Sequence, residues 1–122
     1  SKVCWVVGFS FGAWIAMQLL MRRPEINGFV CVSPPANVRD FSFLAPCPSS
    51  GLMLQGDSDE NISSDSVIKL VEKLSAQRAI EIQYRQVAGA NHFFAGKIDE
   101  MMAEIDEYLD AQLPEGFERS EG

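Results

Sequence analysis

A serine framed by two glycines, in Gly8-Phe9-Ser10-Phe11-Gly12, constrains the fold of this chain more than any other feature. Directly before it lies a run of five apolar residues, from Val3 to Val7, which is the length of a short buried strand. Directly after it, residues 11–23 are almost continuously apolar until Pro24, which ends a helix. The pattern predicts a buried strand, a tight turn with the serine at its tip, and a buried helix.

The spacing of the two glycines has a steric explanation. The backbone of a serine at the tip of so tight a turn is strained, and side chains two residues away on either side are expected to collide, so we expect glycine to be required at both Gly8 and Gly12. The Ser10 hydroxyl then projects above the sheet. The N–H of Phe11, at the start of the helix, points to where negative charge develops on a reacting oxygen. A chance match to G-x-S-x-G in a chain of this length is expected about 4% of the time.

The rest of the chain alternates strands and helices. Apolar periodicity and Gly or Pro boundaries predict strands at residues 28–33, 52–55 and 80–87 and helices at residues 64–77 and 97–112. Alternation of apolar and polar residues in 80–87 indicates an outer strand. This order predicts an α/β fold with one parallel, four-stranded sheet and flanking helices. We expect residues 1–113 to form this domain and the polar tail 114–122 to be disordered.

A serine hydroxyl is a poor nucleophile until a base takes its proton. The chain has one histidine, His92, in a loop that follows the last predicted strand. A third group must orient the imidazole, and the turn after the third strand offers Asp57, Asp59 and Glu60. Capping or turn formation is the alternative role for these carboxylates.

The order strand, G-x-S-x-G, helix, strand, strand ending in G-x-x-D, helix, strand, G-x-x-H, helix resembles the C-terminal half of the α/β-hydrolase fold. It is most similar to small bacterial enzymes of the dienelactone hydrolase and carboxylesterase kind. This resemblance implies that Ser10 is the nucleophile and His92 the base. It also implies that the acid is Asp59, three residues after Gly56, with Asp57 as the second choice. It further implies a hydrolase of small carboxylic esters or related acyl compounds that works through an acyl-enzyme without a cofactor. A peptidase of the same fold is a less favoured alternative.

The chain departs from this pattern because it holds only the last four of the usual eight strands, as though cut from a larger sequence. The loop that donates the second oxyanion N–H belongs to the other half of that fold. A catalytically incompetent fragment that folds by self-association is therefore an alternative. A flavodoxin-like nucleotide-binding module is a weaker one, because the chain has neither a Walker lysine nor G-x-G-x-x-G.

The first strand leads to an expectation about assembly. In the α/β-hydrolase fold another strand pairs along its far side, whereas here the apolar residues from Val3 to Val7 are an uncovered edge. Neither proline nor an inward charge protects this edge. We expect a homodimer paired through it.

Composition excludes several other classes of function. The net charge is −7, and Arg22-Arg23 is the only basic cluster, so nucleic acid and anionic membrane surfaces are not expected partners. No apolar run reaches the length of a membrane span. The three cysteines are widely spaced, so we expect neither a metal site nor a disulfide framework. We expect a cytoplasmic location. Cys4 and Cys31 are expected to be buried, and Cys47 to be a loop thiol.

Overall fold

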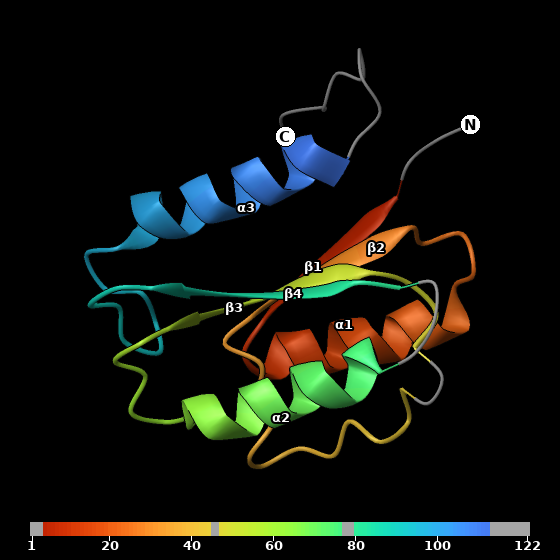
Figure 1. The fold of residues 1–122 in the computed structure, drawn as a ribbon, viewed down its shortest axis with the longest axis horizontal. Coiled ribbons are helices and arrows are strands. Elements are labelled where there is room, and N and C mark those ends of the chain that lie inside the picture. Colours follow the sequence, from red (N-terminus) through yellow and green to blue (C-terminus); the bar gives the residue numbers. More distant parts are fainter. Residues whose placement is uncertain (1–3, 45–46, 77–79, 113–122) are drawn as a thin grey trace.

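The computed structural model describes residues 4–44, 47–76 and 80–112, and within them the chain forms one sheet flanked by helices on both faces (Figure 1). The elements follow in the order β1 (Trp5–Phe9), α1 (Phe11–Arg22), β2 (Gly28–Val32), β3 (Gly51–Gly56), α2 (Ser64–Ser75), β4 (Ile82–Val87) and α3 (Ile98–Gln112). The predicted tail 114–122 and the first residue of the predicted edge strand, Val3, lie outside the described residues.

The four strands are parallel and lie side by side in chain order, β1-β2-β3-β4. This confirms the predicted parallel sheet and the outer position of β4. Phe9 pairs with Val32, and Gly56 pairs with Val87, so the carboxyl ends of all four strands meet at one edge of the sheet. Every loop that carries a candidate functional residue leaves from this edge.

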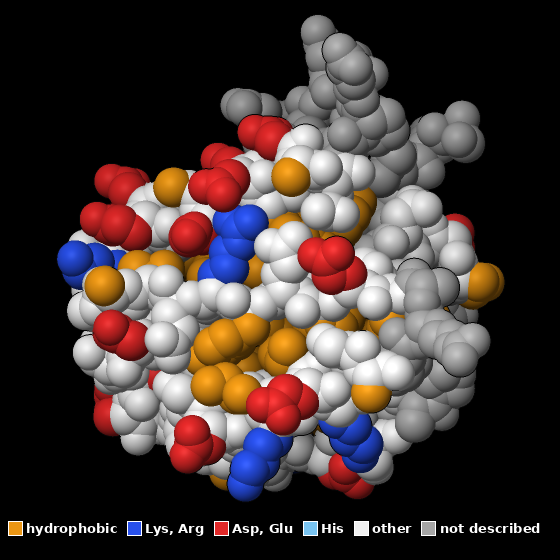
Figure 2. Space-filling model, in the orientation of Figure 1, with side chains coloured by type: hydrophobic (Ala, Val, Ile, Leu, Met, Phe, Trp, Pro, Cys, Tyr) orange, Lys and Arg blue, Asp and Glu red, His pale blue; other side chains and the backbone are white. Residues whose placement is uncertain are grey.

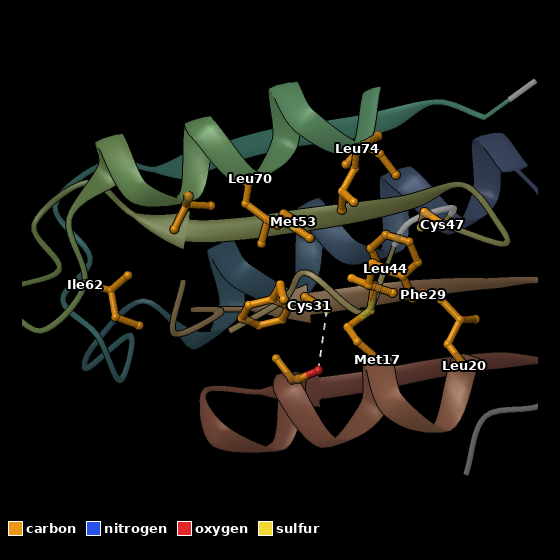
Figure 3. Close-up of a cluster of buried hydrophobic side chains, with 14 residues drawn as sticks. Met17, Leu20, Phe29, Cys31, Leu44, Cys47, Met53, Ile62, Leu70 and Leu74 are labelled. Atoms are coloured by element: carbon orange, nitrogen blue, oxygen red, sulfur yellow. Dashed lines mark hydrogen bonds between the residues drawn. The ribbon is translucent and has the colours of Figure 1, made fainter. Parts of the chain in front are cut away.

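The central strands are buried on both faces. Helices α1 and α2 cover one face, and α3 covers the other (Figure 1). Figure 3 shows Phe29 and Met53 of the sheet between Met17 of α1 and Leu70 of α2. The alternate residues of the same strands pack against α3 and the loop before it. This two-sided burial explains the continuous apolar runs in the sequence.

The loop that joins β2 to β3 contributes to the core. Phe41, Leu44 and Cys47 are all buried in the cluster between the sheet and helices α1 and α2. The expectation that Cys47 is a loop thiol is thus incomplete, because its side chain lies in the core. Burial raises the pKa of the Cys47 and Cys31 thiols above the usual range, which disfavours the nucleophilic thiolate. Cys4, expected to be buried, is exposed.

The expectation that the first strand is fully buried is wrong. Val7 is 57% exposed and Phe9 is 40% exposed. The physical reason is that β1 is an edge strand and that α3 packs mainly over β4, at the other side of the sheet. In the described part of the chain, the outer edge of β1 has no pairing strand.

Helix α1 was expected to be buried on most sides, and this is also wrong. Phe11, Ile15 and Leu19 recur every four residues, and each of them is more than 40% exposed. They form one apolar stripe on the outer side of the helix. The opposite side, with Ala13 and Met17, packs on the sheet.

Helix α3 has an acidic outer surface, which Figure 2 shows as a group of Asp and Glu side chains along this helix. Arg85 of β4 lies within 3.6 Å of a carboxylate oxygen of Glu104 and within 3.5 Å of one of Glu107. These pairs are consistent with a solvated helix face. No helix in the described ranges is long and apolar enough to cross a membrane.

Candidate active site

Ser10 occupies the turn between β1 and α1, and its backbone is strained. Its φ of 54° lies in the left-handed region, which residues other than glycine rarely adopt. The turn is held by the Ser10 N–H, which donates to the Val32 carbonyl at 2.8 Å, and by the Ala13 N–H, which donates to the Ser10 carbonyl at 2.8 Å. The side chain is thereby lifted above the carboxyl edge of the sheet.

The two glycines beside Ser10 are not equivalent. A Cβ atom at Gly8 would collide with the Gly12 carbonyl and would lie 2.7 Å from Cα of Ala13. The helix can start this close to the strand only because Gly8 has no side chain. A Cβ atom at Gly12 would meet nothing within 4 Å, so the expected steric need for glycine there is wrong for this chain.

Phe11 is the first residue of α1. The first N–H groups of a helix have no acceptor within that helix, and they carry the positive end of its dipole. The N–H of Phe11 therefore remains available to an oxygen atom bound beside the Ser10 hydroxyl.

His92 reaches Ser10 from the loop between β4 and α3. Its Nε2 atom lies 2.9 Å from Ser10 Oγ, and the residue is 4% exposed. The side-chain oxygen of Asn91 shapes this loop, because it accepts hydrogen bonds from the N–H groups of Phe93 and Ala95, both at 3.1 Å.

Asp59 lies on the other side of the imidazole. Its Oδ2 atom is 2.9 Å from His92 Nδ1, and the side chain is 1% exposed. Its Oδ1 atom accepts hydrogen bonds from the N–H groups of Asn61 and Ile62, each at 2.9 Å. The structure thus brings Ser10, His92 and Asp59 into one hydrogen-bonded chain.

Asp57 has a different neighbour. Its Oδ1 atom accepts a hydrogen bond of 2.7 Å from the N–H of Gly89. Gly89 lies at the start of the loop between β4 and α3 that carries His92, here called the histidine loop. No hydrogen bond joins Asp57 to the imidazole among the described residues. Glu60 is exposed. Of the three acidic candidates in this turn, Asp59 is the one that contacts His92.

Two buried polar side chains that the sequence analysis did not single out support these loops. Gln55 of β3 is fully buried; its Nε2 donates to the Ile62 carbonyl at 2.8 Å, and its Oε1 accepts from the Tyr84 hydroxyl at 2.9 Å. Ser33, also fully buried, donates from Oγ to the His92 carbonyl at 3.0 Å. The signal in the sequence was a polar residue at the carboxyl end of a buried strand, where ligands bind in parallel sheets.

Aromatic rings surround the imidazole. The ring of Phe93 lies edge-on to it, with centroids 4.9 Å apart, and the ring of Phe9 lies 5.7 Å away. Both phenylalanines are exposed at the surface, Phe93 to 62%. Two exposed aromatic side chains therefore lie beside the imidazole.

This arrangement can move a proton. The Ser10 hydroxyl faces one ring nitrogen of His92, and the buried Asp59 carboxylate faces the other, where it can stabilise an imidazolium that forms during proton transfer. In the described ranges, no group of three His, Cys, Asp or Glu side chains could hold a metal ion.

The chain is similar to a known protein family and to individual proteins of known sequence or structure. The sequence profile of the dienelactone hydrolase family matches residues 1–116. An uncharacterised protein of Rickettsia prowazekii is 56% identical over 108 residues, which are 85% of this chain and 45% of that protein.

Two solved structures also share the fold. A candidate α/β hydrolase of unknown function from Agrobacterium tumefaciens is 61% identical with a TM-score of 0.87, and the match covers 90% of this chain and 50% of that one. An α/β serine hydrolase without a lid from Xanthomonas campestris is 28% identical with a TM-score of 0.80, and the match covers 93% and 49%. The chain thus spans about half the length of the relatives that it matches.

Proposed function

This chain belongs to the dienelactone hydrolase family, and we propose that it is a serine hydrolase that cleaves carboxylic esters or related acyl compounds through an acyl-enzyme. The observation that carries the proposal is the hydrogen-bonded chain from Ser10 through His92 to Asp59. A buried carboxylate, an imidazole and a hydroxyl in this order are the components that make a serine nucleophilic.

In the first half of the reaction, His92 Nε2 takes the hydroxyl proton of Ser10 while Oγ attacks the carbonyl carbon of the ester. Asp59 stabilises the imidazolium that forms and holds its Nδ1–H. The tetrahedral intermediate collapses when the bond to the alcohol oxygen breaks. His92 then gives its proton to that oxygen, and the alcohol leaves while the acyl group remains on Ser10.

In the second half, a water molecule takes the place of the alcohol. His92 removes a proton from the water, whose oxygen attacks the acyl carbon. The bond to Ser10 Oγ breaks, His92 returns the proton to Oγ, and the acid leaves. The enzyme is thereby restored, and the net reaction consumes one water molecule.

Hydrogen-bond donors that are already in place must stabilise the negative charge on the tetrahedral intermediate. The N–H of Phe11 supplies one of them. In the α/β-hydrolase fold, the second comes from a loop in the half that this chain does not share. Losing one such donor lowers the rate by about 10²- to 10³-fold, so we expect slow turnover from the 122-residue chain.

The half-length match and the exposed apolar surfaces of β1 and α1 favour one alternative, which is that the chain is a folded but inactive fragment. The two possibilities differ in the rate that this chain shows, not in its family.

Hydrolysis of p-nitrophenyl acetate separates them. We expect a slow rate above the uncatalysed background that is lost in Ser10→Ala and in His92→Ala. An unchanged rate in Ser10→Ala contradicts the mechanism, and the absence of any rate above background in the parent chain supports the inactive fragment.

A further inference from the structure

We propose that Ser33 is a positioning residue for the imidazole: its buried hydroxyl fixes the backbone of His92 and so holds Nε2 beside Ser10. This inference rests on the proposed function, because it concerns the geometry of the proposed base. It assigns a role to a side chain that the reaction sequence itself does not use.

The loop that carries His92 must cover a long distance across the sheet. Ser10 follows β1, at one edge of the sheet, and the loop that carries His92 follows β4, at the opposite edge. Neighbouring strands lie about 4.8 Å apart, so the loop must cross roughly 14 Å over the ends of β3 and β2. Contacts with the ends of these strands are therefore needed to hold it in place.

β3 and β2 are each followed, at the carboxyl end, by a side chain that contacts His92. Asp59, in the loop after β3, contacts the imidazole, and Ser33, directly after β2, contacts the backbone of the same residue. The Ser33 hydroxyl donates to the His92 carbonyl at 3.0 Å, while the Ser33 N–H donates to the Leu54 carbonyl at 2.7 Å. The anchor is thus itself fixed to β3.

Ser33 is a residue under strain. It has a φ of 52°, in the region that favours glycine, and it is fully buried. Glycine would relieve the backbone strain, but it has no hydroxyl to offer to the His92 carbonyl. Strained residues of this kind persist where the surrounding structure holds them, and they gather at functional sites.

The consequence for the base is direct. The Ser33 hydrogen bond ends on the carbonyl of the residue that carries the imidazole. Without it, the backbone of His92 can shift while the loop remains tied through Asp57 at Gly89. A displacement of about 1 Å at a reacting group can lower a rate by as much as 10²-fold.

The test compares Ser33→Ala and Ser33→Gly with a matched control, Ser50→Ala. The Ser50 hydroxyl also bridges two strand ends, because it accepts from the Glu81 N–H at 2.8 Å, but it lies at the amino ends of β3 and β4, away from the site. Two readouts are measured on each folded variant: kcat and KM for p-nitrophenyl acetate, and the low-field proton NMR signal of the Asp59–His92 hydrogen bond. The chain has a single histidine, so a low-field signal from a histidine ring N–H comes from His92.

We expect both Ser33 variants to lose about 10- to 100-fold in kcat with little change in KM, and the low-field signal to shift or broaden. Ser50→Ala should retain both. Ser33→Gly is the sharper variant, since relief of strain favours its stability while the hydroxyl is still missing. A purely structural role predicts that Ser33→Gly keeps the kcat of the parent chain.

Three outcomes overturn the inference: kcat within twofold of the parent in both Ser33 variants, an unchanged low-field signal in both, or failure of both to fold while Ser50→Ala folds. Failure of the proposed function is recognised separately, because Ser10→Ala would then be as active as the parent. If the parent chain shows no activity, the NMR signal decides alone, with a shift in the Ser33 variants supporting the inference and its absence refuting it.

Discussion

Asp57 and Asp59 stand two residues apart in one turn, and the structure gives them different tasks. Asp59 contacts the imidazole, whereas Asp57 accepts from the Gly89 N–H. Replacing each by asparagine keeps the size of the side chain and removes its charge. We predict that Asp59→Asn greatly slows acylation of Ser10 and that Asp57→Asn does not.

The magnitude follows from the hydrogen bonds of Asp59. In Asp59→Asn, the remaining oxygen continues to accept from Asn61 and Ile62, so the new NH₂ group faces His92 Nδ1. Nδ1 must then accept, which moves the ring proton to Nε2 and prevents this atom from taking the Ser10 proton. The same replacement in a serine protease triad lowers kcat by about 10⁴-fold. We expect a loss of about 10³- to 10⁴-fold here, or about 4–5 kcal/mol of transition-state stabilisation.

In Asp57→Asn the side-chain oxygen can still accept from Gly89, so we expect acylation within about threefold of the parent rate. The assay is the rate at which excess fluorophosphonate labels each variant, followed by intact mass, because it needs one turnover only. Circular dichroism checks that each variant is folded.

A larger loss in Asp57→Asn than in Asp59→Asn would transfer the acid role to Asp57. A loss of less than tenfold in a folded Asp59→Asn would refute the argument that this carboxylate fixes the imidazole tautomer.

Three other predictions concern stability and assembly. Gly8→Ala should lower the free energy of unfolding by about 3 kcal/mol, because the new Cβ would collide with backbone atoms. Gly12→Ala should raise the free energy of unfolding by about 0.5–1 kcal/mol, because its Cβ would lie in open space within a helix. Equal effects of the two variants in urea unfolding would contradict this steric difference. Burial raises the pKa of Tyr108 to about 12, so the unfolded chain loses this proton first, and stability should fall as the pH rises from about 10 to 12. Tyr108→Phe should remove that part of the pH dependence in thermal unfolding and, because the buried hydroxyl has no partner among the described residues, should not destabilise the chain at pH 7. The open edge of β1 should make the 122-residue chain a dimer in sedimentation experiments and Val7→Lys should shift it to monomer, whereas a stable parent monomer would refute edge pairing.

Much of the fold could be predicted because its signals are local. The glycine-flanked serine marks the turn between β1 and α1, and the apolar runs mark the strands, whose limits were found to within one or two residues. The spacing from Gly56 to Asp59 and the single histidine brought into consideration two side chains that the structure joins by a hydrogen bond. Sequence reasoning from the residues alone left Asp57, Asp59 and Glu60 open, and the hydrogen bonds distinguish them.

The remaining features depend on tertiary neighbours that no local pattern encodes. Gly12 faces open space although its motif suggests a collision, and a Cβ atom there would meet nothing within 4 Å among the described residues. The apolar residues of β1 and α1 gave a signal of burial, yet burial requires a covering element. Ser33 looked like the last residue of a strand, and its role follows only from a loop 59 residues further along the chain.

Intact mass after exposure to a fluorophosphonate probe shows whether His92 activates Ser10, because the probe reacts with a serine only where a base has activated it. We predict one adduct per chain, located at Ser10 by peptide mapping and absent from Ser10→Ala and His92→Ala. An unlabelled parent chain, or an adduct that persists in Ser10→Ala, would contradict it.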